Sequence, residues 1–463
     1  MNLLVALFSI AGLIWMLPVI QRGRVLVLAM ITLIVGTVFG PTFFSMDGPI
    51  QLSLDRILWF AMFGLAAIGW RLSYTRVPQV NRIDWLVMAI VGWFFLSALR
   101  GGPVPTGTSP VARWLFYIAM PAGMYAIARM VDIRGKEVRW MLFGAMGLGL
   151  YLAVTAMLEI TGLHQFVFPT YIRNPEQWIF FGRGRGPLMN PAGNGILISI
   201  GVTAATIGFI FAGRREKLLY GAIGLVLLGG IYATLTRSVW MGAFLAMSLV
   251  LLVYSPRWVR VVGLASVVLL GGASAMGMKD QLVRLKRDKK LKAEDAEKSM
   301  QLRPLLAVVA YEMFKDKPMT GFGFGRYMEH SSRYHSNRSY DLPLEQARRY
   351  VQHNVFLSVL VDTGLIGLSL ILAWFTLLAG VSWQLARKMP SRRESQAVGL
   401  LMLGLLAAYA CNGMFHDVLV IPMVHMFLFF LAGVVVTVYH RGLAVPAPEH
   451  SNANVCNAVA GLS

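Results

Sequence analysis

Charged residues are scarce in this sequence, and cysteines are nearly absent. Only 14% of the 463 residues are charged, whereas soluble domains carry about 25%. The two cysteines, Cys411 in an apolar run and Cys456 in a polar tail, cannot supply a disulfide scaffold or a four-ligand zinc site. The composition therefore excludes a soluble globular protein and a disulfide-stapled fold.

Several catalytic signatures are also missing from the chain. It contains no Asp-x-Asp, no His-Glu-x-x-His and no Walker loop. The acidic residues of the long polar segment, such as Asp280, Asp288 and Glu294, are scattered and form no pair. We therefore expect no metal and no cofactor, and the sequence disfavours ATP hydrolysis and a two-carboxylate hydrolase.

Long apolar runs are abundant instead. Hydrophobic residues make up 57% of the chain, and the mean hydropathy is +0.62. A helix needs roughly 20 apolar residues to cross a bilayer, and such runs recur along the whole sequence. They predict an all-α, polytopic membrane protein with about thirteen helices, or about twelve if the first run only half-inserts. The predicted helices cover residues 2–20, 25–44, 54–70, 85–99, 112–130, 140–160, 191–212, 218–235, 239–253, 261–276, 354–385, 396–411 and 418–439.

The basic residues indicate the orientation of these helices. Most arginines and lysines of the short connections fall in alternate ones, for example Arg71, Arg76 and Arg82, and then Arg214 and Arg215. The positive-inside rule places these connections in the cytoplasm. Membrane topology thereby explains the basic residues of the short connections, whereas those of the segment 277–352, which also contribute to the net charge of +20, need another explanation. We expect membrane lipids and no nucleic acid as partners.

The predicted membrane topology divides the chain into four parts. We expect an N-terminal transmembrane block (1–276), a large loop outside the cytoplasm (277–352), C-terminal transmembrane helices (353–440) and a disordered cytoplasmic tail (441–463). Within the loop, residues 279–298 are charge-dense and predict a solvated helix. Residues 303–314 place apolar side chains at helical spacing, which predicts a helix that packs on the membrane domain.

A glycine-rich stretch precedes the helix predicted at 191–212. It contains Arg183 and Arg185, and Arg173 lies ten residues earlier. Guanidinium groups present forked donors that suit phosphate oxygens, and glycine lets a backbone approach closely. The stretch is a candidate anion site; the alternative is a flexible loop whose arginines touch lipid headgroups.

Two further arginines stand at predicted helix ends. Arg237 follows Thr234 and Thr236 in a tight outer turn, where a boundary arginine suggests function; snorkelling to headgroups is the alternative. Arg303 begins the amphipathic loop helix, and a solvated face is the alternative there.

Histidine supplies the candidate general base. His353, followed by Asn354, opens the helix predicted at 354–385, and imidazole has an ordinary pKa near 6.5. A satisfied polar pair that caps the helix is the alternative. His416, in the last outer turn, is a secondary candidate, as is Asn354. The alternating glycines from Gly321 to Gly325 indicate a tight turn with two aromatic anchors.

These stretches together resemble the O-antigen ligase and O-antigen polymerase-like superfamily of bacterial membrane proteins. The resemblance rests on four segments: residues 185–194, residues 236–240, residues 303–325, and residues 353–357 with 362–367. Their order, their spacing and the single large loop between two helical blocks all fit the family.

The resemblance implies a type C glycosyltransferase in the bacterial inner membrane, with its active site and large loop in the periplasm. The implied donor is a glycan linked to undecaprenyl pyrophosphate, and the acceptor is a hydroxyl of lipid A core or of a growing glycan. Arg185 and Arg237 then match the diphosphate-binding arginines, with Arg183 nearby and Arg303 less certain in role, and His353 matches the residue that activates the acceptor.

The leading hypothesis is therefore an O-antigen ligase-like enzyme. A repeat-unit polymerase of O-antigen or exopolysaccharide is the close alternative. A transporter or flippase of lipid-linked glycans is the second alternative, for which paired midplane charges and inverted repeats would be expected.

Overall fold

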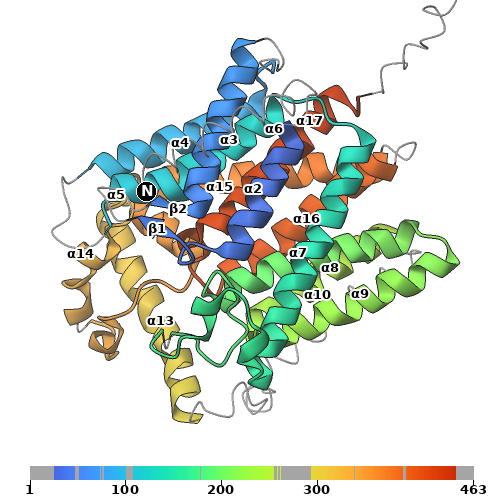
Figure 1. Cartoon of the computed structure of the whole chain (residues 1–463). Coiled ribbons are helices and arrows are strands. Elements are labelled where there is room, and N and C mark those ends of the chain that lie inside the picture. Colours follow the sequence, from blue (N-terminus) through green and yellow to red (C-terminus); the bar gives the residue numbers. More distant parts are fainter. Residues whose placement is uncertain are drawn as a thin grey trace, which may run out of the picture.

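The computed structural model describes residues 25–46, 52–72, 75, 78–100, 108–177, 179–254, 258, 261, 293–337, 339–388 and 393–444. In these residues the fold is a bundle of helices (Figure 1) with one two-stranded antiparallel ribbon. The predicted helix 2–20, nearly all of the predicted helix 261–276, the charged segment up to residue 292 and the tail from 445 lie outside the described residues. The elements are α2 (Val25–Phe39), β1 (Ser45–Met46), β2 (Leu52–Ser53), α3 (Leu54–Arg71), α4 (Arg82–Leu99), α5 (Pro110–Trp114), α6 (Met120–Arg129), α7 (Gly135–Thr161), α8 (Pro191–Phe211), α9 (Arg214–Ala233), α10 (Arg237–Tyr254), α13 (Ala293–Asp316), α14 (Tyr327–Ser331), α15 (Val355–Lys388), α16 (Arg393–Gly413) and α17 (Pro422–Arg441).

The chain is an all-α polytopic membrane protein, as predicted. Nine helices within the described residues are long and apolar enough to span a bilayer, and the shorter α2 is apolar as well. Every predicted helix that falls within these residues has a counterpart with similar bounds. Two details differ. The helix predicted from 418 begins at Pro422 after a 3₁₀ turn, and a π-helical turn, Leu115–Ala119, joins α5 to α6.

The helices are arranged around α16 and α17. In the apolar stretch of each of these two helices, 83% of the residues are buried, compared with 22% in α9. A helix that is apolar all round is stable only where other helices or lipid cover it. Here α16 packs against α8, α10 and α15, and α17 packs against α6, whereas α9 packs mainly against α7 and α8 and has few buried residues.

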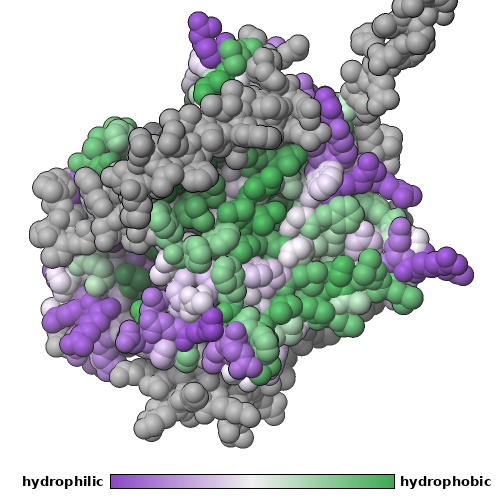
Figure 2. Space-filling model, in the orientation of Figure 1, coloured by the Kyte–Doolittle hydropathy of each residue, from purple (hydrophilic) through white to green (hydrophobic). Residues whose placement is uncertain are grey.

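The two ends of the bundle differ in character. The first end, called the loop end, carries α13 and α14 together with the starts of α10 and α15 and the end of α16. The second, called the basic end, carries the starts of α7, α9 and α16. Figure 2 shows hydrophilic atoms gathered at the connection from α8 to α9 and around α13 and α14, with a broad hydrophobic surface between them. This is the pattern of a protein that spans a membrane.

Helix α15 is broken, although the sequence predicts one uninterrupted helix. Gly364 has φ 72° and ψ −171° inside it, a conformation that glycine adopts most readily. The break frees backbone groups on both sides, which must find partners away from water. The partners are backbone groups of the segment from Pro318 to Gly323: Leu365 N donates to Pro318 O (2.8 Å), Ile366 N to Met319 O (3.4 Å), Phe322 N to Val361 O (2.9 Å) and Gly323 N to Asp362 O (2.9 Å).

The glycine-rich turn of the loop is therefore built into the break. Phe322 and Phe324 are 4% and 2% exposed, so the predicted tight turn with two aromatic anchors is confirmed. Helix α4 completes the junction, because Trp93 Nε1 donates to Thr363 O (3.0 Å) and Ser97 Oγ to Asp362 O (3.1 Å).

Helix α13 buries the predicted apolar face. Leu305, Val309 and Met313 are buried in a cluster that also contains Val361 of α15. Most other members of that cluster belong to the loop itself, including Phe322, Tyr334 and Leu344. The helix thus contacts the membrane domain through α15 and otherwise forms the core of the loop.

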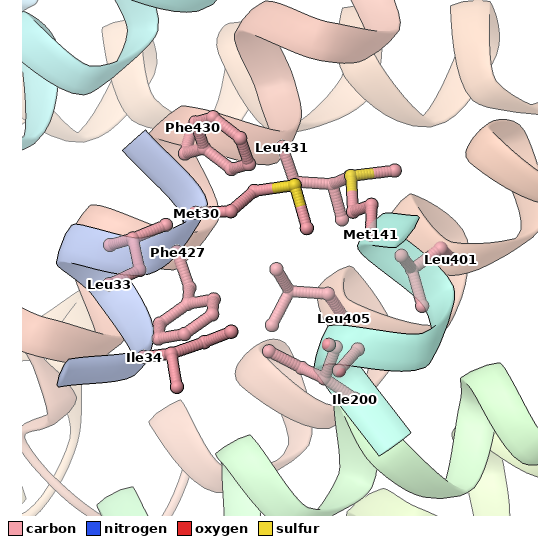
Figure 3. Close-up of a pocket in the computed structure, with 12 residues that line it drawn as sticks. Met30, Leu33, Ile34, Met141, Ile200, Leu401, Leu405, Phe427, Phe430 and Leu431 are labelled. Carbon is pink, nitrogen blue, oxygen red and sulfur yellow. The ribbon is translucent and has the colours of Figure 1, made fainter. Parts of the chain in front are cut away.

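The interior holds a purely apolar cavity between α2, α7, α8, α16 and α17. Its empty volume is about 430 Å³, and its lining includes Met30, Met141 and Phe427 (Figure 3). Every lining residue is apolar or glycine. This cavity therefore offers no group for acid, base or anion chemistry.

Candidate functional site

A pocket at the loop end joins α13, the start of α15 and the turn after α16. It has an empty volume of about 610 Å³, part of it open to solvent, and Arg303, His353, Asn354 and Met414 line it. The structure thus brings together two residues that the sequence singles out fifty positions apart, Arg303 and His353. A cation and an imidazole in one pocket can bind an anion and accept a proton.

His353 is half-buried just before the first residue of α15. Burial lowers the pKa of its imidazole, and the positive charge of Arg303 lowers it further. An imidazole with a lowered pKa remains neutral at pH 7, which is the form required of a general base. Its place at the pocket wall gives it access to a bound substrate.

Arg303 lies over the ring of Phe415, with 5.3 Å between Cζ and the ring centroid. Its Nε is buried and has no hydrogen-bond partner among the described residues. Burial lowers the pKa of Arg303, and the charge of Arg237 adds to this effect. Two guanidinium groups that repel each other beside a pocket are stabilised by an anion that binds near both.

Arg237 begins α10, after the tight turn that the sequence predicts. Leu235 has φ 48° in that turn, and Thr236 Oγ1 donates to Thr234 O (2.9 Å). The turn connects the end of α9 to the start of α10 and places half-buried Arg237 at the loop end. Arg237 is thereby placed close enough to Arg303 for their charges to interact.

Residues 414–417 form a turn that contacts three of the surrounding helices. Met414 O accepts from Asn354 Nδ2 (3.2 Å), and Phe415 lies under Arg303. His416 Nε2 lies 3.0 Å from Ser238 Oγ, next to Arg237. This turn therefore fixes the relative positions of α10, α13 and α15.

Asp417 was not identified from the sequence. Its carboxylate accepts from Ser358 Oγ (3.1 Å) and from Leu419 N (3.3 Å). Burial raises its pKa to about 6. Its position directly after His416, in the short connection before α17, is the only signal that the sequence offers.

Asn354 has a structural role in this arrangement. Its Oδ1 accepts from Phe356 N (2.9 Å) and Leu357 N (3.1 Å), as an N-cap does, and its Nδ2 donates to Met414 O. Both ends of the amide are engaged by the protein. The alternative reading of a polar pair that caps the helix therefore fits Asn354 better than a chemical role.

Arg185 does not line the Arg303 pocket. Its side chain is 0% exposed, and its two terminal nitrogens donate to four backbone carbonyls of the preceding loop, at Ile172 (2.8 Å), Asn174 (3.3 Å), Ile179 (2.9 Å) and Gln177. The Nε lies 3.9 Å from Glu159 Oε2. No terminal donor is left for a ligand, so Arg185 holds the loop in shape.

Glu159 of α7 completes this anchor. Its carboxylate accepts from the backbone N of Gly186 (2.8 Å) and of Arg185 (3.3 Å). Gly184 N donates to Ala233 O at the end of α9 (2.9 Å). The glycine-rich stretch is therefore packed between α7 and α9 and is no flexible loop.

The other arginines of this loop also lie outside the pocket lining. Arg183 is half-buried with its Cζ 5.7 Å from the centroid of Phe180. Arg173 has a buried Nε without a hydrogen-bond partner among the described residues. Of the predicted arginines, Arg303 lines the pocket and Arg237 interacts electrostatically with Arg303, whereas Arg173, Arg183 and Arg185 belong to the loop before α8.

Part of the chain matches a known family. Residues 222–372 match the family described as O-antigen ligase, and no curated protein matches the chain. The predicted resemblance to the O-antigen ligase and polymerase-like superfamily is confirmed over this region. The region contains Arg237, Arg303 and His353 and leaves out Arg185 and the 414–417 turn.

Proposed function

We propose that this protein is an O-antigen ligase-like glycosyltransferase that moves a glycan from undecaprenyl pyrophosphate to an acceptor hydroxyl, with lipid A core as the leading acceptor. The observation that carries the proposal is the pocket in which His353 and Arg303 meet beside Arg237. The matched family supports the class of reaction. The inner-membrane location and the periplasmic face of the pocket belong to the same proposal.

Arg303 and Arg237 would hold the donor through its diphosphate. As the bond between the sugar's anomeric carbon and the diphosphate oxygen breaks, negative charge grows on the departing diphosphate. Two preorganised guanidinium groups would stabilise that charge. The lack of a partner on Arg303 Nε supports an anion at this place.

His353 would act on the acceptor. The acceptor oxygen forms the new bond to the anomeric carbon, and its proton passes to the neutral imidazole. The lipid diphosphate leaves with the electron pair of the broken bond. General-base catalysis of this kind contributes about 10² to 10⁴-fold to the rate.

A repeat-unit polymerase is the second candidate, because the match to the family over residues 222–372 does not distinguish the two reactions. The two candidates differ in the acceptor and share the donor chemistry. Arg185, another residue of the implied diphosphate set, would support the site from a distance by shaping the loop next to α9.

The surface glycans of a strain that lacks this chain provide the test. Loss of polymer from lipid A, with long polymer still present on the carrier, supports the ligase. Single repeat units on lipid A support the polymerase. A normal glycan profile contradicts both.

A further inference from the structure

A second large cavity lies at the basic end of the bundle. Its empty volume is about 950 Å³, and it opens between α7, α8, α9 and α16. The start of α16 and the end of α8 border it, whereas the Arg303 pocket lies beyond the opposite end of α16. The reaction proposed above makes no use of this cavity.

The walls of this cavity are apolar. Leu142, Phe143 and Met146 of α7 face Ile207 and Phe211 of α8 across it. Phe143 is 56% exposed, so this wall continues onto the lipid-facing surface. Such walls suit a hydrocarbon chain and give a sugar or a free inorganic anion little to bind.

The mouth of the cavity is charged. Arg139 Nη1 lies 4.0 Å from Glu394 Oε1, and 64% of the Arg139 side chain is exposed. Arg393 is also exposed, and its Nη1 donates to Phe211 O at 3.4 Å. A guanidinium has five donor hydrogens, so each arginine retains donors for a ligand.

Two carboxylates, Glu216 and Glu394, also line the cavity, and their negative charges oppose the binding of an anion. Glu216 Oε2 accepts from Gly213 N (3.2 Å) at the start of α9, and Glu394 is the partner of Arg139. Each lies in the first turn of its helix, where a negative charge is stabilised by the helix dipole. Both carboxylates thus have contacts of their own.

Further cations surround the mouth. Arg214 and Arg215 are exposed in the first turn of α9, and Lys136 is exposed in the first turn of α7. Figure 2 shows hydrophilic atoms at the connection that leads into α9, beside the hydrophobic surface of the bundle. Trp140, next to Arg139, is 64% exposed, as is typical of tryptophan at the membrane interface.

We propose that this cavity binds an anionic glycerophospholipid, with one acyl chain between α7 and α8 and the phosphate at Arg139 and Arg393. The combination of apolar walls and a basic mouth at interface depth matches an amphiphile with a negative head. Basic pockets between transmembrane helices are known to take such headgroups. The site is independent of the transfer reaction, so either proposal can fail alone.

Native mass spectrometry of the purified full-length chain tests the site. The protein is titrated in detergent with phosphatidylglycerol, and separately with phosphatidylcholine of the same acyl chains. We expect the wild type to prefer one phosphatidylglycerol over phosphatidylcholine. The double variant Arg139→Gln/Arg393→Gln should weaken phosphatidylglycerol binding about tenfold or more, since each basic residue near an anionic headgroup contributes measurably.

Two more variants make the test decisive. Leu142→Trp fills the cavity without changing any charge, and it should weaken both lipids. Arg71→Gln removes an exposed arginine at the end of α3, away from the cavity lining, and it should change neither. Circular dichroism checks that each variant is folded.

Three outcomes overturn the proposal. The first is equal affinity of the wild type for the two lipids. The second is unchanged phosphatidylglycerol binding in both the double variant and Leu142→Trp. The third is equal weakening by Arg71→Gln, which would show that the basic end attracts anionic lipid without a defined site.

Discussion

At the scale of single residues, the charge beside His353 should be visible in the pH dependence of transfer. Burial and Arg303 both lower the pKa of this imidazole, so the neutral base persists below pH 6.5. Loss of the Arg303 charge in Arg303→Gln should raise the pKa of His353. We therefore expect the acidic limb of kcat/KM to move to higher pH in this variant, measured relative to each enzyme's own maximum.

Two controls accompany this measurement. His353→Ala should lose about 10² to 10⁴-fold of the rate and should still bind the donor, because the arginines remain. His416→Ala should lose much less, since His416 contacts Ser238 and does not line the pocket. An unchanged acidic limb in Arg303→Gln, or near-normal transfer by His353→Ala, would remove the histidine from the mechanism.

Arg185 should behave as a stabilising residue. A lysine cannot replace a fork that bonds to four carbonyls, and hydrogen bonds from charged donors contribute about 1.5–3 kcal/mol each. We expect Arg185→Lys to lower the free energy of unfolding by at least about 3 kcal/mol, seen as a lower Tm in detergent. Arg183→Lys, at a half-buried site, is the matched control and should change Tm little.

Donor binding decides between the two roles of Arg185. The folded fraction of Arg185→Lys should still bind a lipid-linked donor. If the variant had a normal Tm and did not bind the donor, Arg185 would instead be a ligand of the diphosphate.

The sequence predicted part of this site and missed the rest for a physical reason. Arg237, Arg303 and His353 were predicted from residue type and from their places at helix ends, and the structure brings them together. The contacts of Arg185 were not predicted, because its acceptors are backbone carbonyls of a loop that folds back on it. Every residue carries a backbone carbonyl, so a sequence motif cannot show which carbonyls accept these hydrogen bonds.

At the scale of elements, helix positions were predictable and the break in α15 was not. Apolar length fixes where a helix can span, and the predicted bounds differ by only a few residues from those observed. The break depends on Gly364, one of several glycines in the same helix, together with backbone partners in the loop. A glycine in a sequence does not tell whether its φ is positive.

The break can be tested by adding one methyl group. A Cβ at Gly364 would lie 2.2 Å from Met319 O, and the φ of 72° is itself unfavourable for alanine. We expect Gly364→Ala to lower the free energy of unfolding by about 2–5 kcal/mol, from backbone strain and overpacking.

Gly380→Ala in the same helix provides the control, because a Cβ there meets nothing within 4 Å. It should leave Tm unchanged or raise it slightly, as alanine favours a helix over glycine. Thermal unfolding in detergent gives both values. Equal Tm for the two variants would show that the break contributes nothing to stability.

At the scale of the whole molecule, the alternation of basic connections predicts one orientation for all helices. The loop end should face away from the cytoplasm and the basic end toward it. Cysteines at Ser332, exposed in the loop, and at Gly213, where a Cβ meets nothing within 4 Å, report the two sides. They are placed in a background with Cys411 and Cys456 replaced by serine.

We expect an impermeant thiol reagent to label Ser332→Cys and not Gly213→Cys in cells with a permeabilised outer membrane. Lysed cells, in which both should react, provide the control. Labelling of Gly213→Cys alone in the unlysed cells would reverse the orientation.

The broken helix α15 also bears on how the chain is made. Its partners, Trp93, Ser97 and the segment 318–323, all precede it in the sequence, so each has left the ribosome before α15 emerges. The freed backbone groups can therefore form their hydrogen bonds as the helix enters the bilayer, where a backbone group without a hydrogen bond costs free energy. A rearranged gene that places residues 353–388 ahead of residue 318 would put the helix in the membrane before its partners exist, and the first sign should be rapid degradation of the new chain.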